Sequence, residues 1–365
     1  LIGKKLFSIE QGWTIMAVYG TLPLNLFLSR AVLPEAALLC FFTGGFYFFL
    51  KWIDNQRLLT LIISAVFTSL AISQKLPAAF MGLAMIGLCL MKFKTKTFIK
   101  WELWLFAAIA LLPSYFYFTW LHTVAEFKFV SGIGLLHILP EFLTVITTPA
   151  AAKYYSTDFI MAFDWIVLIT AGLGLIAVIV RRNWIVLLWS LSMILEVILV
   201  VSVIRFRYYL ALFTPIVAML SGLLIGSVWS KFRWGQLVSL ILIAAIFYNS
   251  SIIDKDYFKQ EEWIEKAVKI INENTEKEDL IVISTFSPAP LSQSDRKGWR
   301  GNLKYYDYIP QNITGELNYF IENGAKYFLV YKNRIQGDDG SYLKYLKKNY
   351  KGNPYGEDFV LYKLQ

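Results

Sequence analysis

Charged and reactive side chains are scarce in this chain of 365 residues. Charged residues make up 17% of it, with two cysteines and two histidines. Cys40 and Cys89 both lie in apolar segments, so the sequence predicts no disulfide framework. His122 and His137 are far apart and lack acidic neighbours, so we expect no metal site. The patterns G-x-G-x-x-G and G-x-x-x-x-G-K-[ST] are missing as well, so nothing indicates a bound nucleotide, and no cofactor is expected.

Apolar residues are abundant instead. The chain is 57% hydrophobic and 17% aromatic, and its mean hydropathy of +0.52 is too high for a soluble protein of this length. A bilayer core about 30 Å thick needs roughly 20 apolar residues per helix. Uncharged segments near that length occur at 11–29, 36–50, 58–74, 76–91, 103–125, 165–180, 208–230 and 234–253, and 183–204 is interrupted only by Glu196. The sequence therefore predicts about nine spanning helices.

The distribution of charge predicts the topology. Residues 1–251 contain 18 Lys and Arg against 9 Asp and Glu, whereas residues 252–365 contain 17 of each. The basic residues gather in alternate loops, which the positive-inside rule assigns to the cytoplasm. These are Lys4, Lys5, Lys51, Arg57, Lys92, Lys94, Lys96, Lys100, Arg181, Arg182, Lys231 and Arg233. Basic residues in short membrane loops set orientation, so we expect no nucleic-acid partner, and residues 252–365 are predicted to be extracytoplasmic.

One loop of the membrane part, residues 119–159, is long. Its apolar piece at 132–149 is bounded by Pro140 and Pro149 and is too broken to span the bilayer. We expect an interfacial or re-entrant helix there, covering a site on the outer face.

The tail predicts a small α/β domain over residues 252–365. Its apolar periodicity alternates between that of helices and that of strands, which favours βαβ-type units over a short sheet. The expected helices are 258–274, 316–323 and 341–349, and the expected strands are 280–284, 326–331 and 358–364.

Four cations lie at predicted outer ends of helices, against the orientation rule: Arg30, Lys75, Arg205 and Arg207. Each one alone is explained by snorkelling toward lipid headgroups. Together they form the kind of cationic cluster that binds a phosphate embedded in lipid, since Arg offers a bidentate fork and Lys a point charge. Tyr208 and Tyr209 follow the two arginines and are also typical of a membrane-interface belt.

The segments that carry these cations resemble a known family. Ser29-Arg30-Ala31-Val32-Leu33-Pro34-Glu35, the hairpin Ser73-Gln74-Lys75-Leu76-Pro77, and Arg205-Phe206-Arg207-Tyr208-Tyr209 with Pro215 occur in this order. They resemble motifs of the GT-C superfamily of membrane glycosyltransferases that use polyprenyl-phosphate sugars. The similar branch contains protein O-mannosyltransferases and lipid A aminoarabinose transferases. Asp295-Arg296-Lys297-Gly298-Trp299 in the tail also resembles bacterial members.

The resemblance implies a function in the cell envelope. An acceptor hydroxyl attacks the anomeric carbon of the sugar with inversion, and polyprenyl phosphate leaves on the extracytoplasmic side of a multi-pass protein, here of bacterial type. Lys75, Arg205 and Arg207, supported by Arg30 and Tyr208, are then expected to bind the lipid phosphate. The acceptor, a lipid, glycan or protein, and the sugar are not specified by the sequence.

The resemblance also places the general base in an outer loop before Leu1, so the chain looks like a fragment truncated at its N-terminus that lacks this base. Glu35 is a weak substitute within the chain, and pairing of Glu35 with Arg30 explains it equally well. Asp158 and Asp164 are expected to cap helices, and Glu126 and Glu141 lie in the outer loop. Glu196 inside a spanning segment is either functional or held between helices.

Two other functional classes remain open. A transporter or flippase for a lipid-linked intermediate would also bind a lipid phosphate, although no inverted internal repeat is evident. A non-catalytic membrane scaffold whose tail binds a partner would need no general base.

Overall fold

The computed structural model describes residues 1–124, 138–145, 147–231, 233–257, 261–301, 306, 308–335 and 338–365. The chain forms two compact units, a helical one within residues 1–258 and a smaller α/β one within residues 259–365. This confirms the predicted fold class, a mostly α-helical membrane bundle followed by a small α/β domain. The predicted division at residue 251 falls inside helix α15 (Gly235–Tyr257), which continues past it.

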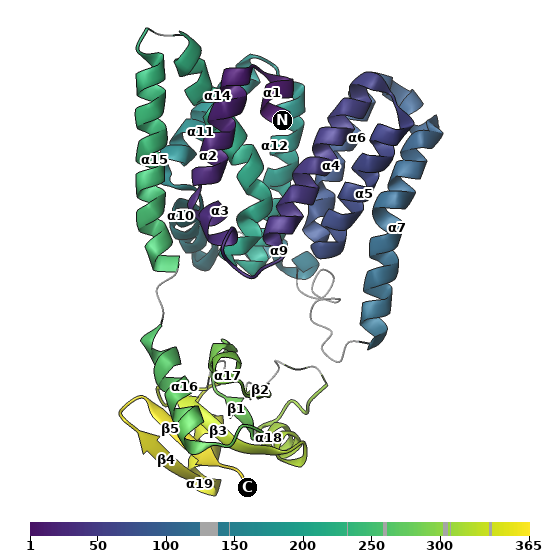
Figure 1. The fold of residues 1–365 in the computed structure, drawn as a ribbon. Helices are drawn as coiled ribbons and strands as arrows, with labels where there is room; N and C mark the ends of the chain where they lie inside the picture. The colour runs from purple at the N-terminus through teal and green to yellow at the C-terminus, as the bar shows by residue number, and fades with distance from the viewer. Residues whose placement is uncertain are drawn as a thin grey trace. The chain divides into compact units, whose positions relative to one another are not determined.

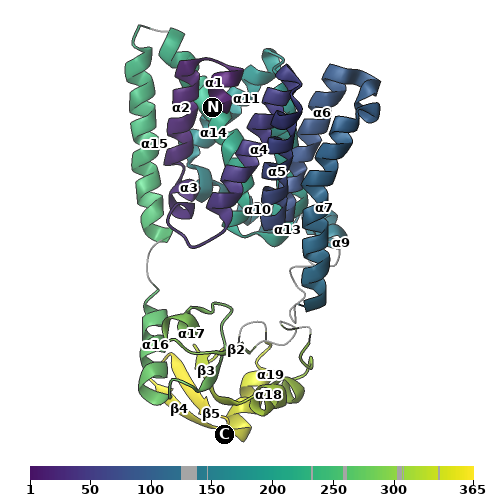
Figure 2. The ribbon, with the colours of Figure 1, turned by 45° about the vertical axis from the view of Figure 1, so that its right-hand side comes forward.

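The helical unit is built from antiparallel helices joined by short turns (Figures 1 and 2). Its other elements are α1 (Ile2–Leu6), α2 (Ile9–Thr21), α3 (Pro23–Leu28), α4 (Glu35–Asn55), α5 (Leu58–Gln74), η1 (Leu76–Phe80), α6 (Met81–Phe93), η2 (Lys94–Ile99), α7 (Trp101–Val124), α9 (Leu139–Val145), α10 (Pro149–Phe163), α11 (Trp165–Val180), α12 (Trp184–Glu196), η4 (Val197–Val201), α13 (Ser202–Ile204), η5 (Arg207–Phe213) and α14 (Thr214–Lys231).

All nine predicted segments are helical, but fewer than nine qualify as full spans. Six helical stretches in the described chain are long and apolar enough to cross a membrane, and α10 with α11 makes a seventh if this pair, bent by 96°, is one span. Helix α5 has 17 residues and α2 has 13, ending before Pro23. The protein is therefore a multi-pass membrane protein with six or seven qualifying spans among the described residues, and the two other predicted segments form the shorter helices α2 and α5.

Small residues let α14 pack closely in the centre of the unit. The Thr14 hydroxyl donates to the carbonyl of Gly222 over 2.7 Å, and a Cβ at Gly222 would lie 2.4 Å from the Cα of Ile15. A Cβ at Gly174 would likewise lie 2.1 Å from the carbonyl oxygen of Leu220. Close backbone approach of this kind is the usual basis of helix association in lipid.

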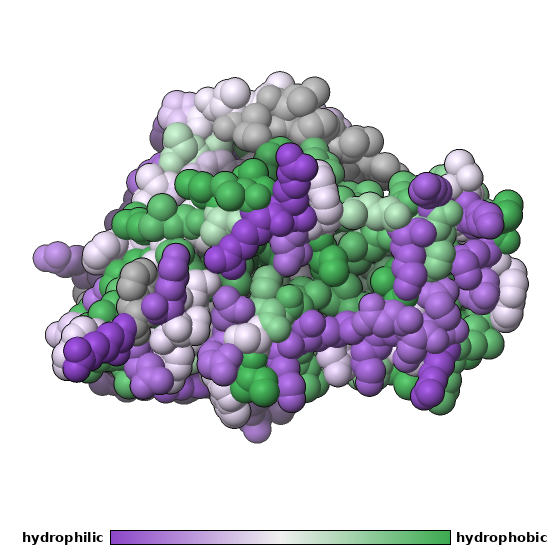
Figure 3. All heavy atoms as spheres, turned by 90° about the horizontal axis from the view of Figure 1, so that it is seen from above, coloured by the Kyte–Doolittle hydropathy of each residue, from purple (hydrophilic) through white to green (hydrophobic). Residues whose placement is uncertain are grey.

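The end of the helical unit that carries α1 and the α14–α15 turn presents many hydrophilic side chains (Figure 3). The exposed Lys4, Lys94, Lys96 and Arg233 belong to it. Lys75, which follows α5, and Arg207, the first residue of η5, lie at the other end of the helical unit. The predicted separation of the basic loops from the candidate site cations therefore corresponds to the two ends of one bundle.

The predicted interfacial helix at 132–149 falls partly outside the described residues. The described part contains the short helix α9 and the start of α10. Helix α10 then meets α11 at the sharp bend, where Asp164 has a positive φ of 67°.

The α/β unit contains a five-stranded mixed sheet in the order β2-β1-β3-β5-β4. β2 and β3 flank β1 in parallel, whereas β5 runs antiparallel to both β3 and β4. Its elements are α16 (Glu262–Asn274), β1 (Leu280–Ile283), α17 (Ala289–Gln293), β2 (Gly298–Arg300), α18 (Ile313–Glu322), β3 (Ala325–Tyr331), α19 (Ser341–Asn349), β4 (Lys351–Tyr355) and β5 (Phe359–Lys363). All six predicted elements exist, and β2, β4 and α17 are additional.

Candidate functional site

Lys75 occupies the one-residue joint between α5 and η1. Its backbone N–H closes the last turn of α5 by donating to Ala71 over 3.1 Å, and Pro77 near the start of η1 prevents α5 from continuing. The predicted tight hairpin is thus present. The lysine side chain does not project from its tip, however, and is only 15% exposed because it turns into the protein.

The ammonium group of Lys75 donates a hydrogen bond to Glu35, the first residue of α4. The Glu35 side chain is 1% exposed, and its second carboxylate oxygen has no hydrogen-bond partner among the described residues. Glu35 thus pairs with Lys75 and not with Arg30, the partner that the sequence offered as an alternative. Arg30 instead reaches Asp254 near the end of α15, with 3.2 Å between Nη1 and Oδ2.

Two tyrosine rings complete the surroundings of the Lys75 ammonium. Its Nζ lies 4.5 Å from the ring centroid of Tyr208 and 4.2 Å from that of Tyr209. These distances are typical of cation–π contacts, which are strongest where water is excluded. We refer to Lys75, Glu35, Tyr208 and Tyr209 as the Lys75 cluster. It joins the α5–η1 hairpin to the start of η5, segments that are far apart in the sequence.

The two arginines of the R-x-R-Y-Y segment have different surroundings. Arg205 ends α13 with a left-handed φ of 51° and is exposed, without an ion pair in the described part of the chain. Arg207 is partly buried and donates from Nε to Asp158 of α10 over 2.9 Å. Asp158 therefore lies inside a helix and pairs with Arg207, so the expectation that it caps a helix is wrong.

Glu196 is a fully buried carboxylate at the end of α12. It is 0% exposed, and neither of its carboxylate oxygens has a hydrogen-bond partner among the described residues. Lys75 and Tyr154 are close enough to interact with it electrostatically. The next turn, η4, is a π-helix, an arrangement that is frequent at functional sites.

The remaining candidate carboxylates lie elsewhere. Asp164 caps α11, as expected, by accepting from the backbone N–H of Ile166 over 2.8 Å. Glu141 is exposed on α9, and Glu126 lies outside the described residues. Within the described ranges, no group of three or more His, Cys, Asp or Glu side chains is placed to hold a metal ion.

The D-R-K-G-W segment of the tail is held by contacts within the α/β unit. Arg296 donates to the carbonyl of Thr275 over 3.1 Å and to that of Ser294 over 2.8 Å. Trp299 packs on Phe320, with 5.4 Å between ring centroids. These contacts connect β2 with α18 and with the C-terminal ends of α16 and α17, so the segment organises this unit.

Of the predicted site residues, the structure brings Lys75, Glu35 and Tyr208 together, with Arg207 beside Tyr208 in the chain. Arg30 belongs to a separate ion pair, and Arg205 points to the surface. Sequence reasoning missed Asp158 as the partner of Arg207 and Tyr209 as a second ring over Lys75. The Lys75 ammonium with its two neighbouring phenols can bind an anion at a membrane face, and so can the Arg207 guanidinium, which lies against Asp158 and Met161 of α10.

No protein-family model and no curated protein sequence matches this chain. Among solved structures, it is similar to an oligosaccharyltransferase of Archaeoglobus fulgidus in complex with zinc and sulfate. The two share 13% sequence identity at a TM-score of 0.52, and the match covers 99% of this chain and 58% of that protein. The chain thus spans little more than half of the similar structure. It has the fold of that oligosaccharyltransferase, a GT-C fold.

Proposed function

We propose that this protein transfers a sugar from a polyprenyl-phosphate donor to an acceptor at the extracytoplasmic membrane face, with inversion at the anomeric carbon. The observation that carries the proposal is the meeting of Lys75 with the R-x-R-Y-Y segment at one end of the bundle. One fold is used by proteins with many different functions. The similar structure therefore supports the proposal through its architecture alone, and the chemistry of the Lys75 cluster supports the proposed binding of a phosphate.

The leaving group explains why cations are needed. When the acceptor oxygen bonds to the anomeric carbon, the bond between that carbon and the phosphate oxygen breaks, and the proton of the acceptor hydroxyl is released to water at the extracytoplasmic face. The phosphate then gains one negative charge. Lys75 and Arg207 stabilise this charge where water is scarce, as oriented donors do in other enzymes. Arg205, exposed two residues before Arg207, offers a further guanidinium at the surface, and we assign Tyr208 a hydroxyl contact with the phosphate.

Ion pairs keep these cations in place before the donor arrives. Glu35 orients Lys75, and Asp158 orients Arg207. Since an ammonium has three donors and a guanidinium five, each cation can bind a phosphate oxygen and keep its carboxylate. Glu35 is buried and already accepts from Lys75, which suits a positioning role better than that of a general base. Arg30, bound to Asp254, supports the site electrostatically from the outer end of α3.

Sugar transfer by the full chain in lipid nanodiscs tests this function. With a polyprenyl-phosphate sugar and a panel of lipid, glycan and peptide acceptors, the wild type should transfer sugar. Arg207→Gln should lower kcat by about 10²- to 10³-fold, as loss of one charge-stabilising donor does.

Arg57→Gln is the matched control, because Arg57 is an exposed cation at the opposite end of α5 from Lys75. If Arg57→Gln lowers transfer as much as Arg207→Gln, or if a folded wild type binds no polyprenyl phosphate, the proposal is wrong. Movement of the intact lipid across the bilayer without sugar transfer would indicate a flippase, and partner binding by the tail alone would indicate a scaffold.

A further inference from the structure

A carboxylate that the proposed transfer step does not use lies next to the Lys75 cluster. Glu196 ends α12, which packs against η1 and η5, the two segments that meet at Lys75. Its side chain is 0% exposed, and neither carboxylate oxygen has a hydrogen-bond partner among the described residues. A carboxylate inside a membrane span is costly, so its presence there points to a function.

The titratable groups near Glu196 come from few segments. Lys75 interacts with it electrostatically from the α5–η1 joint, and Tyr154 and Tyr155 do so from α10. Helix η5 contributes the two tyrosines of the Lys75 cluster and Arg207, which is paired with Asp158. The remaining titratable groups on helices packed against α12 or η4 are the cap of α11, an exposed glutamate of α9 and residues near the opposite end of the bundle: Asp164, Glu141, Cys89, Lys92 and Lys231. Among the described residues, Lys75 is therefore the cation that acts on Glu196.

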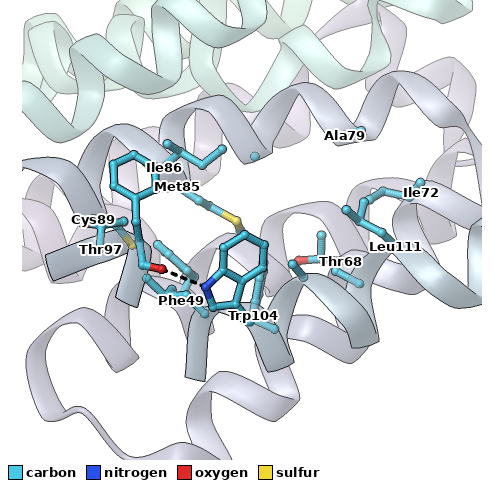
Figure 4. A pocket seen from close by; sticks show the side chains of 16 residues that line it. Phe49, Thr68, Ile72, Ala79, Met85, Ile86, Cys89, Thr97, Trp104 and Leu111 are labelled. Atoms are coloured by element: carbon cyan, nitrogen blue, oxygen red, sulfur yellow. Dashed lines mark hydrogen bonds between the residues drawn. The ribbon is translucent and has the colours of Figure 1, made fainter. Parts of the chain in front are cut away.

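Two cavities near these helices do not reach Glu196. The crevice between α5, α6 and α7 is lined by apolar side chains that include Ile72 and Trp104 (Figure 4), and neither Lys75 nor Glu196 belongs to its walls. The groove that α12 lines with Trp189 does not include Glu196 either. The charge of this carboxylate is thus governed by the groups packed around it, where electrostatic interactions are stronger than in water.

Two opposing effects act on the proton of Glu196. Burial without a hydrogen-bond donor favours the neutral acid, whereas the nearby Lys75 ammonium favours the ionised carboxylate. Glu35 already accepts a hydrogen bond from that ammonium, so one cation serves two carboxylates. If both stayed ionised, a phosphate bound at Lys75 would place three anions around one cation in a poorly solvated site. A proton on Glu196 removes one of those anions.

We propose that Glu196 is a positioning residue that acts through Lys75 and takes up one proton when the phosphate of the donor binds. The inference rests on the proposed function, because it places the phosphate at Lys75. In the empty site, ionised Glu196 and Glu35 together hold the ammonium. When the phosphate arrives, a proton from water at the extracytoplasmic face adds to a carboxylate oxygen of Glu196, and the ammonium directs an N–H to a phosphate oxygen. Departure of polyprenyl phosphate returns the proton to water.

Binding of undecaprenyl methyl phosphate to the full chain in nanodiscs tests this inference. The lipid is a diester with one fixed charge, so it lacks the second ionisation, at a pH of about 6, that a phosphate monoester has. Calorimetry in buffers with different heats of ionisation counts the protons taken up on binding. The wild type should take up protons and bind most tightly in acid. Its dissociation constant should rise by up to about tenfold per pH unit, the limit for one linked proton.

Neutral substitutions should remove this pH dependence. Glu196→Gln resembles the protonated acid, so it should bind the diester without proton uptake and, in alkali, at least about tenfold more tightly than the wild type, a gain of about 1.4 kcal/mol. Glu196→Met should do the same, and it replaces the glutamine variant if thermal unfolding shows that variant to be unfolded. Glu141→Gln is the matched control, because Glu141 is an exposed glutamate of α9 outside the Lys75 cluster, and it should keep the proton uptake of the wild type.

The outcomes separate this inference from the proposed function. If the wild type binds the diester in a Lys75-dependent way without proton uptake, or if folded Glu196→Gln and Glu196→Met take up as many protons as the wild type, the inference is wrong and the phosphate site stands. Loss of proton uptake in Glu35→Gln alone would assign the proton to Glu35 and would also overturn it. If the wild type binds the diester no better than the uncharged undecaprenol, the phosphate site at Lys75 is wrong.

Discussion

Glu35 accepts a hydrogen bond from the ammonium of Lys75, and both side chains are withdrawn from solvent at the junction of α4 with the α5–η1 hairpin. Removing one member of a buried ion pair leaves an uncompensated charge and costs about 3–5 kcal/mol. We expect Lys75→Met to destabilise the helical unit by that amount, measured by denaturant unfolding in mixed micelles. The double variant Lys75→Met/Glu35→Gln should recover most of the loss, because no buried charge remains unpaired. If Lys75→Met alone is as stable as the wild type, the ion pair of Lys75 with Glu35 is solvated well enough that its loss does not change the free energy of unfolding.

We expect Glu196 to lower the unfolding temperature of the protein and to contribute to sugar transfer at the site. A buried carboxylate without hydrogen-bond partners is costly, and an apolar residue of similar volume often stabilises a protein at such a position. Glu196→Met should therefore unfold at a higher temperature than the wild type and transfer sugar at least about tenfold more slowly, a common exchange between stability and activity. Glu196→Gln keeps the shape and separates loss of charge from loss of packing. Full activity in a stabilised Glu196→Met protein would assign this residue no role at the site.

The α/β unit should lose stability in acid through Asp279. Burial opposes ionisation of this side chain, but the ion pair with Lys326, 2.6 Å from Nζ to Oδ1, and a hydrogen bond from the backbone N–H of Glu276 outweigh burial and hold its pKa below the ordinary value. A lowered pKa stabilises the folded state above the unfolded value, about 3.9. That contribution is lost as the pH falls through the folded pKa. We expect Asp279→Asn to flatten the decline in melting temperature of the full chain below about pH 4.

Asp295 is the control for the acid effect. Its pKa is also lowered, by a hydrogen bond from Lys277, but both side chains are largely exposed, and exposed pairs contribute little. Asp295→Asn should leave the acid profile as it is in the wild type. If both variants flatten the profile equally, burial of the Asp279 carboxylate does not control acid stability.

Much of the fold could be predicted from the sequence, because apolar runs and basic loops are direct consequences of the bilayer. The sequence also predicted which helix ends carry the cations. The partners of those cations were not, since the contacts of Lys75 with Glu35 and of Arg207 with Asp158 are set by how distant helices pack. The strand β2 was missed because it is very short and polar, and β4 because it contains Gly352 and Pro354, which are rare in strand interiors.

The pairing of β2 with β1 requires glycine at position 298. Its φ is 152°, and a Cβ there would lie 1.8 Å from the carbonyl oxygen of Ile281 on the adjacent strand. Gly298→Ala should therefore separate β2 from β1 and lower the melting temperature of the α/β unit. Gly356→Ala is the comparison, because Gly356 also has a positive φ, 64°, but has open space around it, and its cost should be limited to backbone strain. Equal effects of the two substitutions would contradict the close approach of β2 to β1.

Binding of undecaprenyl phosphate to the Lys75→Met/Glu35→Gln variant is the most direct test of the central claim, that Lys75 binds the donor phosphate. This variant removes the cation without leaving a buried charge, so its folding can be matched to the wild type before binding is measured in nanodiscs. We expect undecaprenyl phosphate to bind at least about tenfold more weakly, a loss of about 1.4 kcal/mol, with Glu35→Gln alone having a smaller effect. A folded double variant that binds as tightly as the wild type would contradict the phosphate site at Lys75.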